Sequence, residues 1–383
     1  MDMTNAGHLK IALLVQGMQL EESAKQSLGN KWQEKIYSYS LTDWVDKKIV
    51  LPSDIKLDER VYVGFRFNPN SPWRLVGDDN GRRVVDREGL EVKATLIPRS
   101  SYYDRLTSRG EKMQSIGVSC GNHGVSFFLN SYCEYFKHGE NCRFCSLVPT
   151  QKKFSDTVKR KTVEQVRETT QTILDLGCKL DFIQLSGGSL YDHDKENRDY
   201  IPFILTIHEE LAKRKLVGVV PIHLTPMPPK NLDILLELRG AGLDTISFDV
   251  ECPTQTYFER YCPGKTRTQG YRNMRKALTA AQDVFGRGNV FSIIILGIEP
   301  RKSFVNGVED LLKDGITPTL NIYHHDPFCS ADSDLKVPDV EETIQTAQDI
   351  GALFRQYNAV PGNLGCAHYD IGHEIAKVSP NEV

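Results

Sequence analysis

The segments LDFIQLSGG (180–188) and YIPFILTIHEELAKR (200–214) carry the pattern that decides the fold of this chain. The first is a short apolar run bounded by a glycine pair, which is typical of a buried strand. The second has its apolar residues at helical spacing, which is typical of an amphipathic helix. A buried strand followed by such a helix forms one β–α unit, and a series of these units favours a parallel sheet with right-handed crossovers.

The same unit recurs along the chain. Further strand-like runs, each followed by a helical stretch, are GVSFFLN (124–130), GVVPIHLTP (218–226), DTISFDVE (244–251), NVFSIIILGIEP (289–300) and TPTLNIYHHDP (317–327). Six units in sequence are short of the eight that close a full barrel. We therefore expect an α/β fold, a partial (β/α)6 TIM-type barrel with an N-terminal α+β extension.

The chain divides into three parts by composition. Residues 1–110 contain the polar turn signals NPNSP and GDDNG between short β-like runs, and we expect an α+β extension of unknown role there. Residues 111–358 form the predicted barrel. The glycine-rich segment 359–383 is interpreted equally well as a lid over the barrel mouth or as a packed tail.

Composition excludes several classes of protein. With 40% apolar and 25% charged residues, the chain of 383 residues is typical of a globular protein with a large core. Its net charge of −3 makes a nucleic-acid partner improbable, and no run of 18 apolar residues indicates a membrane span. The N-terminus has an acid at position 2 and no small-residue cleavage site, so we interpret it as part of the fold. We expect a cytoplasmic protein whose nine cysteines are reduced.

The predicted strands carry polar side chains on one face and apolar side chains on the other. A packed barrel fills its interior with bulky aliphatic residues, and unpaired buried polar groups are costly. We therefore expect an open barrel whose interior binds a ligand. The polar face comprises Ser126, Phe128, Asn130, Gln184, Ser186, His223, Thr225, Ser247, Asp249, Glu251, Asn321, Tyr323 and His325.

Three cysteines follow the first strand of the predicted barrel. Cys133, Cys142 and Cys145 have the spacing C-x8-C-x2-C and lie at the end of the strand where α/β barrels position their active sites. Thiolates at this density suit zinc or an iron–sulfur cluster. A closed zinc site needs a fourth ligand, and Cys120 lies before the strand, where seven extended residues put roughly 23 Å between it and the others.

These cysteines resemble the cluster motif of the radical SAM superfamily, in which three thiolates leave one iron of a 4Fe-4S cluster open for S-adenosylmethionine (SAM). The resemblance covers about residues 115–330. The motifs are most similar to those of the biotin synthase and lipoyl synthase branch. Two features depart from the family pattern. The first cysteine gap is x8 where x3 is usual, and Ser189 stands where an acid usually follows the glycine pair.

The resemblance also implies residues that bind SAM. Phe144 stands where the family contacts the adenine, and Ser186, Gly187 and Gly188 match the glycine-rich motif that meets the methionine amino group. The other implied residues are Asp249 and Glu251 for the ribose or the amino group, Arg267 for the carboxylate, and Gly297 and Ile298 for packing on the adenine.

The resemblance implies a reaction as well. One electron from the reduced cluster cleaves SAM to methionine and a 5′-deoxyadenosyl radical, which removes hydrogen from a small organic substrate. We expect a role in cofactor or natural-product biosynthesis, with a flavodoxin- or ferredoxin-like protein as electron donor. Whether SAM is consumed or regenerated stays open.

Substrate-side candidates lie on the third and sixth strands. His223, Tyr323, His325 and Asp326 are the predicted catalytic residues, although a strand histidine is more often a hydrogen-bonded core residue. Four further cysteines have no assigned role: Cys252, Cys262, Cys329 and Cys366.

Two other functions remain open at this point. One is radical SAM modification of RNA or a peptide, with residues 1–110 as the recognition module. The other is a non-catalytic module that binds zinc or an iron–sulfur cluster.

Overall fold

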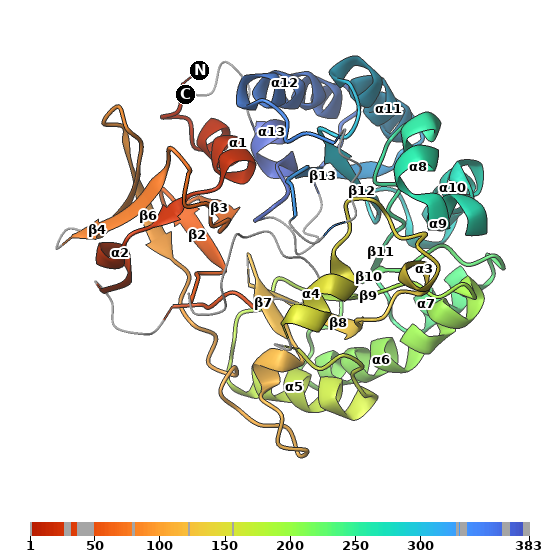
Figure 1. Ribbon diagram of the computed structural model, residues 1–383. Helices are drawn as coiled ribbons and strands as arrows, with labels where there is room; N and C mark the ends of the chain where they lie inside the picture. The colour runs from red at the N-terminus through yellow and green to blue at the C-terminus, as the bar shows by residue number, and fades with distance from the viewer. Residues whose placement is uncertain are drawn as a thin grey trace.

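The computed structural model contains two sheets, one in the N-terminal part of the chain and one in the barrel (Figure 1). None of the described helices is long and apolar enough to cross a membrane. The residues that the structure describes are 2–26, 32–36, 50–78, 81–121, 123–154, 157–326, 329, 335–361 and 368–377.

The barrel sheet has seven strands in the order β13-β12-β11-β10-β9-β8-β7. Six of them are parallel and match the six predicted β–α units, so the predicted partial barrel is confirmed. The seventh, β7 (Val118–Cys120), pairs antiparallel with β8 and was not predicted, because three residues are too few to show alternation. The six parallel strands are β8 (Gly124–Asn130), β9 (Phe182–Gly187), β10 (Ile222–Thr225), β11 (Thr245–Ser247), β12 (Val290–Leu296) and β13 (Thr317–Ile322).

Helices cover the outer surface of this sheet (Figure 1). The helices that follow the strands include α5 (Val163–Asp175), α6 (His193–Lys213), α7 (Ile234–Gly240), α8 (Gln255–Tyr261), α9 (Pro263–Thr268), α10 (Tyr271–Phe285), α11 (Arg301–Lys313) and α12 (Val340–Gln356). The short helices are η1 (Met113–Ser115), α3 (Glu134–Lys137), α4 (Leu147–Lys153) and α13 (Gly372–Lys377).

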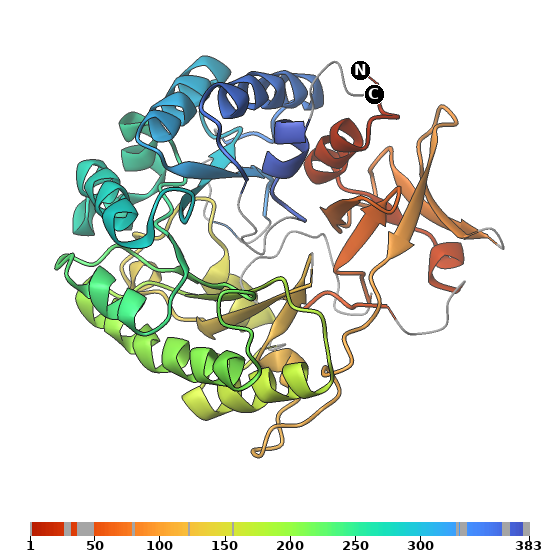
Figure 2. The same ribbon diagram turned by 180° about the vertical axis from the view of Figure 1, so that it is seen from behind.

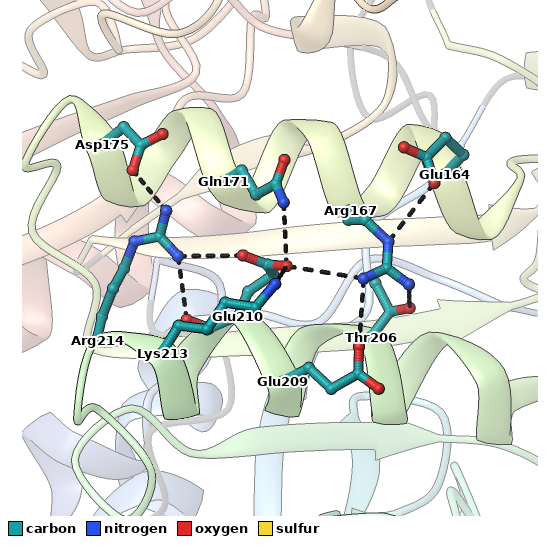
Figure 3. Close-up of polar contacts among 9 residues, drawn as sticks. All are labelled: Glu164, Arg167, Gln171, Asp175, Thr206, Glu209, Glu210, Lys213 and Arg214. Carbon is teal, nitrogen blue, oxygen red and sulfur yellow. Dashed lines mark hydrogen bonds and ion pairs between the residues drawn. The ribbon is translucent and has the colours of Figure 1, made fainter.

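Helix α5 illustrates how the sequence forms one of these elements. It begins at a capping box, in which the Thr162 hydroxyl accepts from the Gln165 backbone N–H while the Gln165 side chain accepts from the Thr162 N–H. One face of α5 packs on the barrel, and its outer edge is joined to α6 by ion pairs around the buried Glu210 (Figure 3).

The N-terminal part forms a sheet of six strands in the order β1-β4-β5-β6-β2-β3. This sheet lies to one side of the barrel in both views (Figure 1, Figure 2). Its elements are α1 (Ala6–Gln16), β1 (Gln19–Leu20), α2 (Glu22–Gln26), β2 (Asp54–Leu57), β3 (Val61–Gly64), β4 (Arg74–Asp78), β5 (Gly81–Val85) and β6 (Glu91–Leu96).

The N-terminal part contacts both edges of the barrel sheet. At the β7 edge, the Ser119 N–H donates to the Tyr103 hydroxyl at 2.9 Å. At the β13 edge, segment 368–371 lies between the two sheets: the Gly64 N–H donates to the His368 carbonyl at 2.7 Å, and the Ile371 N–H donates to the Leu320 carbonyl at 3.0 Å. The N-terminal sheet therefore covers the gap between the two edge strands of the open barrel.

The division into residues 1–110, 111–358 and 359–383 stays a prediction. The described part of the C-terminal segment is packed, since Ile371 is fully buried and Asp370 accepts hydrogen bonds from the Leu320 and Gly372 N–H groups. Residues 362–367, which include Cys366, and residues 378–383 lie outside the described part of the chain.

Candidate active site

One cavity of about 390 Å³ occupies the interior of the barrel and reaches the N-terminal sheet. Most of the polar strand face that the alternation predicts lines it, so the expected open interior is present. These lining residues are Ser126, Phe128, Gln184, Ser186, Thr225, Asp249, Glu251, Asn321 and Tyr323. Strand β12, which is apolar on both faces, contributes Ile293 and Ile295.

The three predicted cluster ligands all line this cavity. Cys133 follows β8 and precedes α3, and Cys145 precedes α4 with its N–H donating to the Cys142 carbonyl at 3.0 Å. Cys120 also lines the cavity but lies at the other end of β8, paired with Gly124. Among the described residues, no group of three or more His, Cys, Asp or Glu side chains converges as the ligands of a single metal ion do.

Burial raises the pKa of the thiols of all three cysteines. It raises the pKa of Cys133 to about 11 and raises the pKa of Cys145, while contact with Cys262 and burial raise the pKa of Cys142. Thiolates in this position therefore need a cation, and an iron–sulfur cluster supplies that charge because a coordinating thiol is deprotonated. The donor set of three thiols on one cavity wall fits such a cluster.

The cysteine loop is held by its neighbours. The Arg143 N–H donates to the Tyr261 carbonyl at 2.9 Å, and a Cβ on Gly264 would lie 2.5 Å from the Tyr135 ring. Next to Cys145, the Ser146 hydroxyl donates to the buried Asp326 carboxylate. The loop is thus fixed between α9 and the segment that follows β13.

The glycine pair at the end of β9, Gly187 and Gly188, packs against the cysteine loop. A Cβ on Gly188 would lie 2.4 Å from the Tyr132 carbonyl oxygen and 2.8 Å from the Cys133 Cβ. The Gly188 N–H donates to the Asn130 carbonyl at 2.7 Å. Glycine here lets the end of β9 approach the cysteine loop closely, and Ser186, Gly187 and Gly188 all line the cavity.

Two carboxylates and a lysine form a buried group beside the cysteines. Lys265 donates to the Glu251 carboxylate at 2.8 Å and to the Asp249 carbonyl at 2.7 Å. Burial raises the pKa of Asp249 and of Glu251, and Lys265 opposes that shift. Burial alone would lower the pKa of Lys265, but Glu251, Cys142, Cys262 and Asp249 raise it, so the lysine stays charged.

Glu251 has an unusual backbone. Its φ of 63° is in the left-handed region, which a residue other than glycine rarely adopts. The strand contacts on both sides hold it there: the Glu251 N–H donates to the Ile293 carbonyl at 2.9 Å, and the Ile295 N–H donates to the Glu251 carbonyl at 2.7 Å. Strain of this kind clusters at functional sites.

The other residues that were predicted to contact SAM do not all lie at the cavity. Phe144 lines the cavity. Arg267 does not: its half-exposed guanidinium pairs with Glu140 at 2.7 Å and lies over the Tyr191 ring. Gly297 packs on Pro338 and Ile298 is buried in the core, so neither lines the cavity.

The four residues predicted to be catalytic also lie in different environments. Tyr323 lines the cavity, and its buried hydroxyl has no hydrogen-bond partner among the described residues. His223 is buried behind the lining, with its ring nitrogens 2.8 Å and 3.1 Å from the Thr245 and Thr225 hydroxyls, and burial lowers its pKa to about 3. His325 is exposed and Asp326 is the buried partner of Ser146.

Two of the unassigned cysteines lie behind the cavity wall. Cys252 and Cys262 are fully buried, and the Cys262 thiol contacts both Cys252 and Cys142. Neither lines the cavity. Cys329 is half-buried.

Comparison with known proteins agrees with this site. Residues 139–311, which include Cys142, Cys145, Asp249, Glu251 and Lys265, match the family described as the Radical SAM superfamily. The radical SAM prediction is therefore supported over residues 139–311. The cofactors of this family are a 4Fe-4S cluster and SAM. Its biotin synthase-like branch and the x8 spacing of the cluster motif stay predictions.

Individual relatives of this chain are distant. The chain is 22% identical over 262 residues to a bacteriochlorophyllide c C-7(1)-hydroxylase of Chlorobaculum limnaeum. That match covers 65% of this chain and 64% of the hydroxylase, which is less than two thirds of its length.

Two similar solved structures are also distant in sequence. Methylornithine synthase is 14% identical with a TM-score of 0.46, and the match covers 65% of this chain and 69% of that one. A radical SAM methyltransferase from Sphaerobacter thermophilus is 13% identical with a TM-score of 0.42, covering 74% of this chain and 76% of that one.

Sequence reasoning missed two sets of cavity residues. Lys265 lies in the same segment as Arg267, and its spacing from Glu251 carried no signal that a salt bridge would form. The N-terminal residues gave no chemical pattern at all, yet several of them line the cavity: Leu14, Lys35, Ile36, Ser53, Asp54 and Arg66.

Proposed function

We propose that this protein is a radical SAM enzyme that acts on a small organic substrate in cofactor or natural-product biosynthesis. The observation that carries the proposal is that Cys133, Cys142 and Cys145 line one cavity together with the Glu251–Lys265 pair. When bound, the cluster and SAM supply a 5′-deoxyadenosyl radical, which removes a hydrogen atom from the substrate.

Different residues of this chain would bind the cluster and SAM. Cys133, Cys142 and Cys145 would hold the cluster. Gly187 and Gly188 let the backbone at the end of β9 pack against the cysteine loop, where its carbonyls would meet the amino group of the methionine part of SAM.

Charged groups next to the cysteines suit the two ends of the methionine part of SAM. Glu251 would accept from the amino group or the ribose, and Lys265 would pair with the carboxylate. Arg267 is the alternative cation, which would have to leave Glu140 to reach the cavity. The closed, largely apolar interior would exclude water from the radical.

The choice of pathway is supported by one relative. The hydroxylase from Chlorobaculum limnaeum is named for a bacteriochlorophyllide, so a role in cofactor biosynthesis is consistent with that likeness. Family membership favours an enzyme over a non-catalytic metal module. The net charge of −3 gives no support to RNA as substrate. A flavodoxin- or ferredoxin-like electron donor is part of the proposal.

The test is anaerobic reconstitution with iron and sulfide, chemical reduction, addition of SAM, and detection of 5′-deoxyadenosine. We expect about four irons and four sulfides per chain and deoxyadenosine that depends on all three cysteines. One zinc per chain without sulfide would overturn the proposal and favour the metal-module alternative.

A further inference from the structure

Five polar residues at or near β2, β13 and segment 368–371 line the cavity: Ser53, Asp54, Asn321, Tyr323 and His368, with His368 beside Asp54. We call these five residues the N-terminal wall. None of them belongs to the cysteine loop, the glycine pair or the Glu251–Lys265 pair, so we assign the N-terminal wall to the substrate.

This wall is rigidly joined to the barrel. The Gly64 N–H donates to the His368 carbonyl at 2.7 Å, which fixes segment 368–371 to β3. The buried Lys10 donates to the Asp370 carbonyl at 2.6 Å, and the Asp370 carboxylate accepts from the Leu320 N–H at 2.7 Å. Asp54 and β13 are therefore held at a set distance by hydrogen bonds from α1, β3 and β13.

Several polar atoms of the wall lack partners. The Ser53 Oγ, Asp54 Oδ1, Asn321 Oδ1, Tyr323 hydroxyl and His368 Nδ1 are buried with no hydrogen-bond partner among the described residues. The closest approach is 3.7 Å between His368 Nδ1 and Asp54 Oδ1, which is too long for a hydrogen bond. Asp54 is only 3% exposed and Tyr323 only 2%.

A buried polar atom without a partner costs about 1–3 kcal/mol. Native proteins contain few such atoms, and each requires an explanation. Five in one cavity wall are explained together if a ligand supplies their partners.

We propose that the N-terminal wall is the substrate-binding subsite and that it takes a hydroxyl or amino group of the substrate. This inference rests on the proposed function and deepens it. The Asp54 and Asn321 oxygens accept hydrogen bonds only, so the group must donate to them. The Tyr323 hydroxyl can donate to the same group or accept from it.

The cationic side chains near the N-terminal wall do not make it a binding site for an anion. Lys35 donates to the Phe65 carbonyl at 2.6 Å, and an Arg66 Nη1 donates to the carbonyls of Leu14 and Val15. These hydrogen bonds direct both cations at backbone oxygens, while the Asp54 carboxylate faces the cavity and repels an anion. The aliphatic residues Leu14, Ile36, Ile293 and Ile295 complete the lining, so an apolar body is expected next to the donor group.

The experiment uses three probes with one ring and three different ends: benzylamine, benzyl alcohol and phenylacetate. Each is titrated by ligand-observed NMR into the reconstituted, unreduced full chain with saturating SAM, which occupies the cofactor part of the cavity. We expect benzylamine and benzyl alcohol to bind more tightly than phenylacetate.

The deciding variant is Asp54→Asn, which keeps the side-chain shape and removes the charge. We expect it to weaken benzylamine binding roughly tenfold and benzyl alcohol binding less, with phenylacetate unchanged or improved. Glu88→Gln, an exposed carboxylate between β5 and β6, is the matched control and is expected to leave all three affinities unchanged.

Tighter binding of phenylacetate, or unchanged benzylamine affinity in Asp54→Asn, would overturn the inference. If Asp54→Asn does not fold, Tyr323→Phe removes only one hydroxyl and is expected to weaken benzyl alcohol. Deoxyadenosine formation in the same preparations reports on the proposed function separately, so loss of one result does not imply loss of the other.

Discussion

The α5–α6 surface and the barrel cavity both contain buried carboxylates, but the pKa of these carboxylates is shifted in opposite directions. On the outer surface, burial alone would raise the pKa of Glu210, yet hydrogen bonds from Lys213, Gln171 and Arg214 lower it (Figure 3). In the cavity, burial raises the pKa of Asp249 and Glu251, although Lys265 opposes the shift for both and hydrogen bonds from Ser247 and the Ile293 N–H oppose it for Asp249.

This difference separates stability from function. The Glu210 carboxylate accepts hydrogen bonds from Gln171, Lys213 and Arg214 and pairs with Arg167, so the network joins α5 to α6. The cavity carboxylates have fewer partners, and the same cavity contains unpartnered atoms of Asn321 and Tyr323. Incomplete hydrogen bonding is what a ligand-binding wall requires.

The largest effect is expected at the cysteine loop. Cys142→Ala removes one of three cluster ligands, and we expect loss of the cluster absorbance and of deoxyadenosine formation. Cys262→Ala is the control, because Cys262 is as deeply buried and touches Cys142 but does not line the cavity. Retention of the cluster in Cys142→Ala together with its loss in Cys262→Ala would exchange the two ligand assignments.

A second large effect is expected at Lys265. Lys265→Met removes the buried cation proposed to pair with the SAM carboxylate, a loss of about 2–5 kcal/mol for such pairs, which predicts SAM affinity reduced roughly 30-fold or more. Arg267→Met removes a half-exposed pair with Glu140, and a change below about fivefold is expected.

Equilibrium dialysis with SAM at equal iron content distinguishes the two. The reverse order of effects would make Arg267 the carboxylate ligand, as the sequence resemblance implies, and would require its side chain to leave Glu140.

A moderate effect is expected at the outer network. Glu210→Ala removes the acceptor shared by α5 and α6, and we expect the free energy of unfolding to fall by about 1–3 kcal/mol, with deoxyadenosine formation unchanged. Glu209→Ala, whose carboxylate is exposed and pairs only with Arg167 among the described residues, is the control and should leave the thermal midpoint nearly unaltered. Lost SAM cleavage in Glu210→Ala at unchanged stability would contradict the separation drawn here.

The smallest effect is a pH dependence of the same network. The pKa of Glu210 is lowered below its ordinary value of 4.5 in the folded chain, so its stabilising charge is fully present above pH 4.5. That contribution is lost as the pH falls through the folded pKa. The difference in unfolding free energy between the wild type and Glu210→Gln, measured by urea titration, should therefore shrink below pH 4.5; a difference that grows instead would mean that Glu210 is not held ionised.

Sequence by itself determined the partial barrel and the cavity, because both follow from periodicity. Six strand–helix repeats require a parallel sheet, and alternation along each strand assigns one polar face to the interior. The three cysteines could be assigned to the active end of the barrel for the same reason, since Cys133 follows directly after β8.

Tertiary structure alone decided which polar groups meet. Lys265 and Arg267 are two residues apart on α9 and therefore point in different directions, so only packing assigns the buried position to Lys265 and the exposed one to Arg267. Likewise, His324 lines the cavity while its neighbour His325 is exposed, because the chain has left β13 and strand alternation no longer applies. The N-terminal wall depends on the approach of His368 to Asp54, two residues far apart in the sequence, and such long-range contacts leave no local pattern in the sequence.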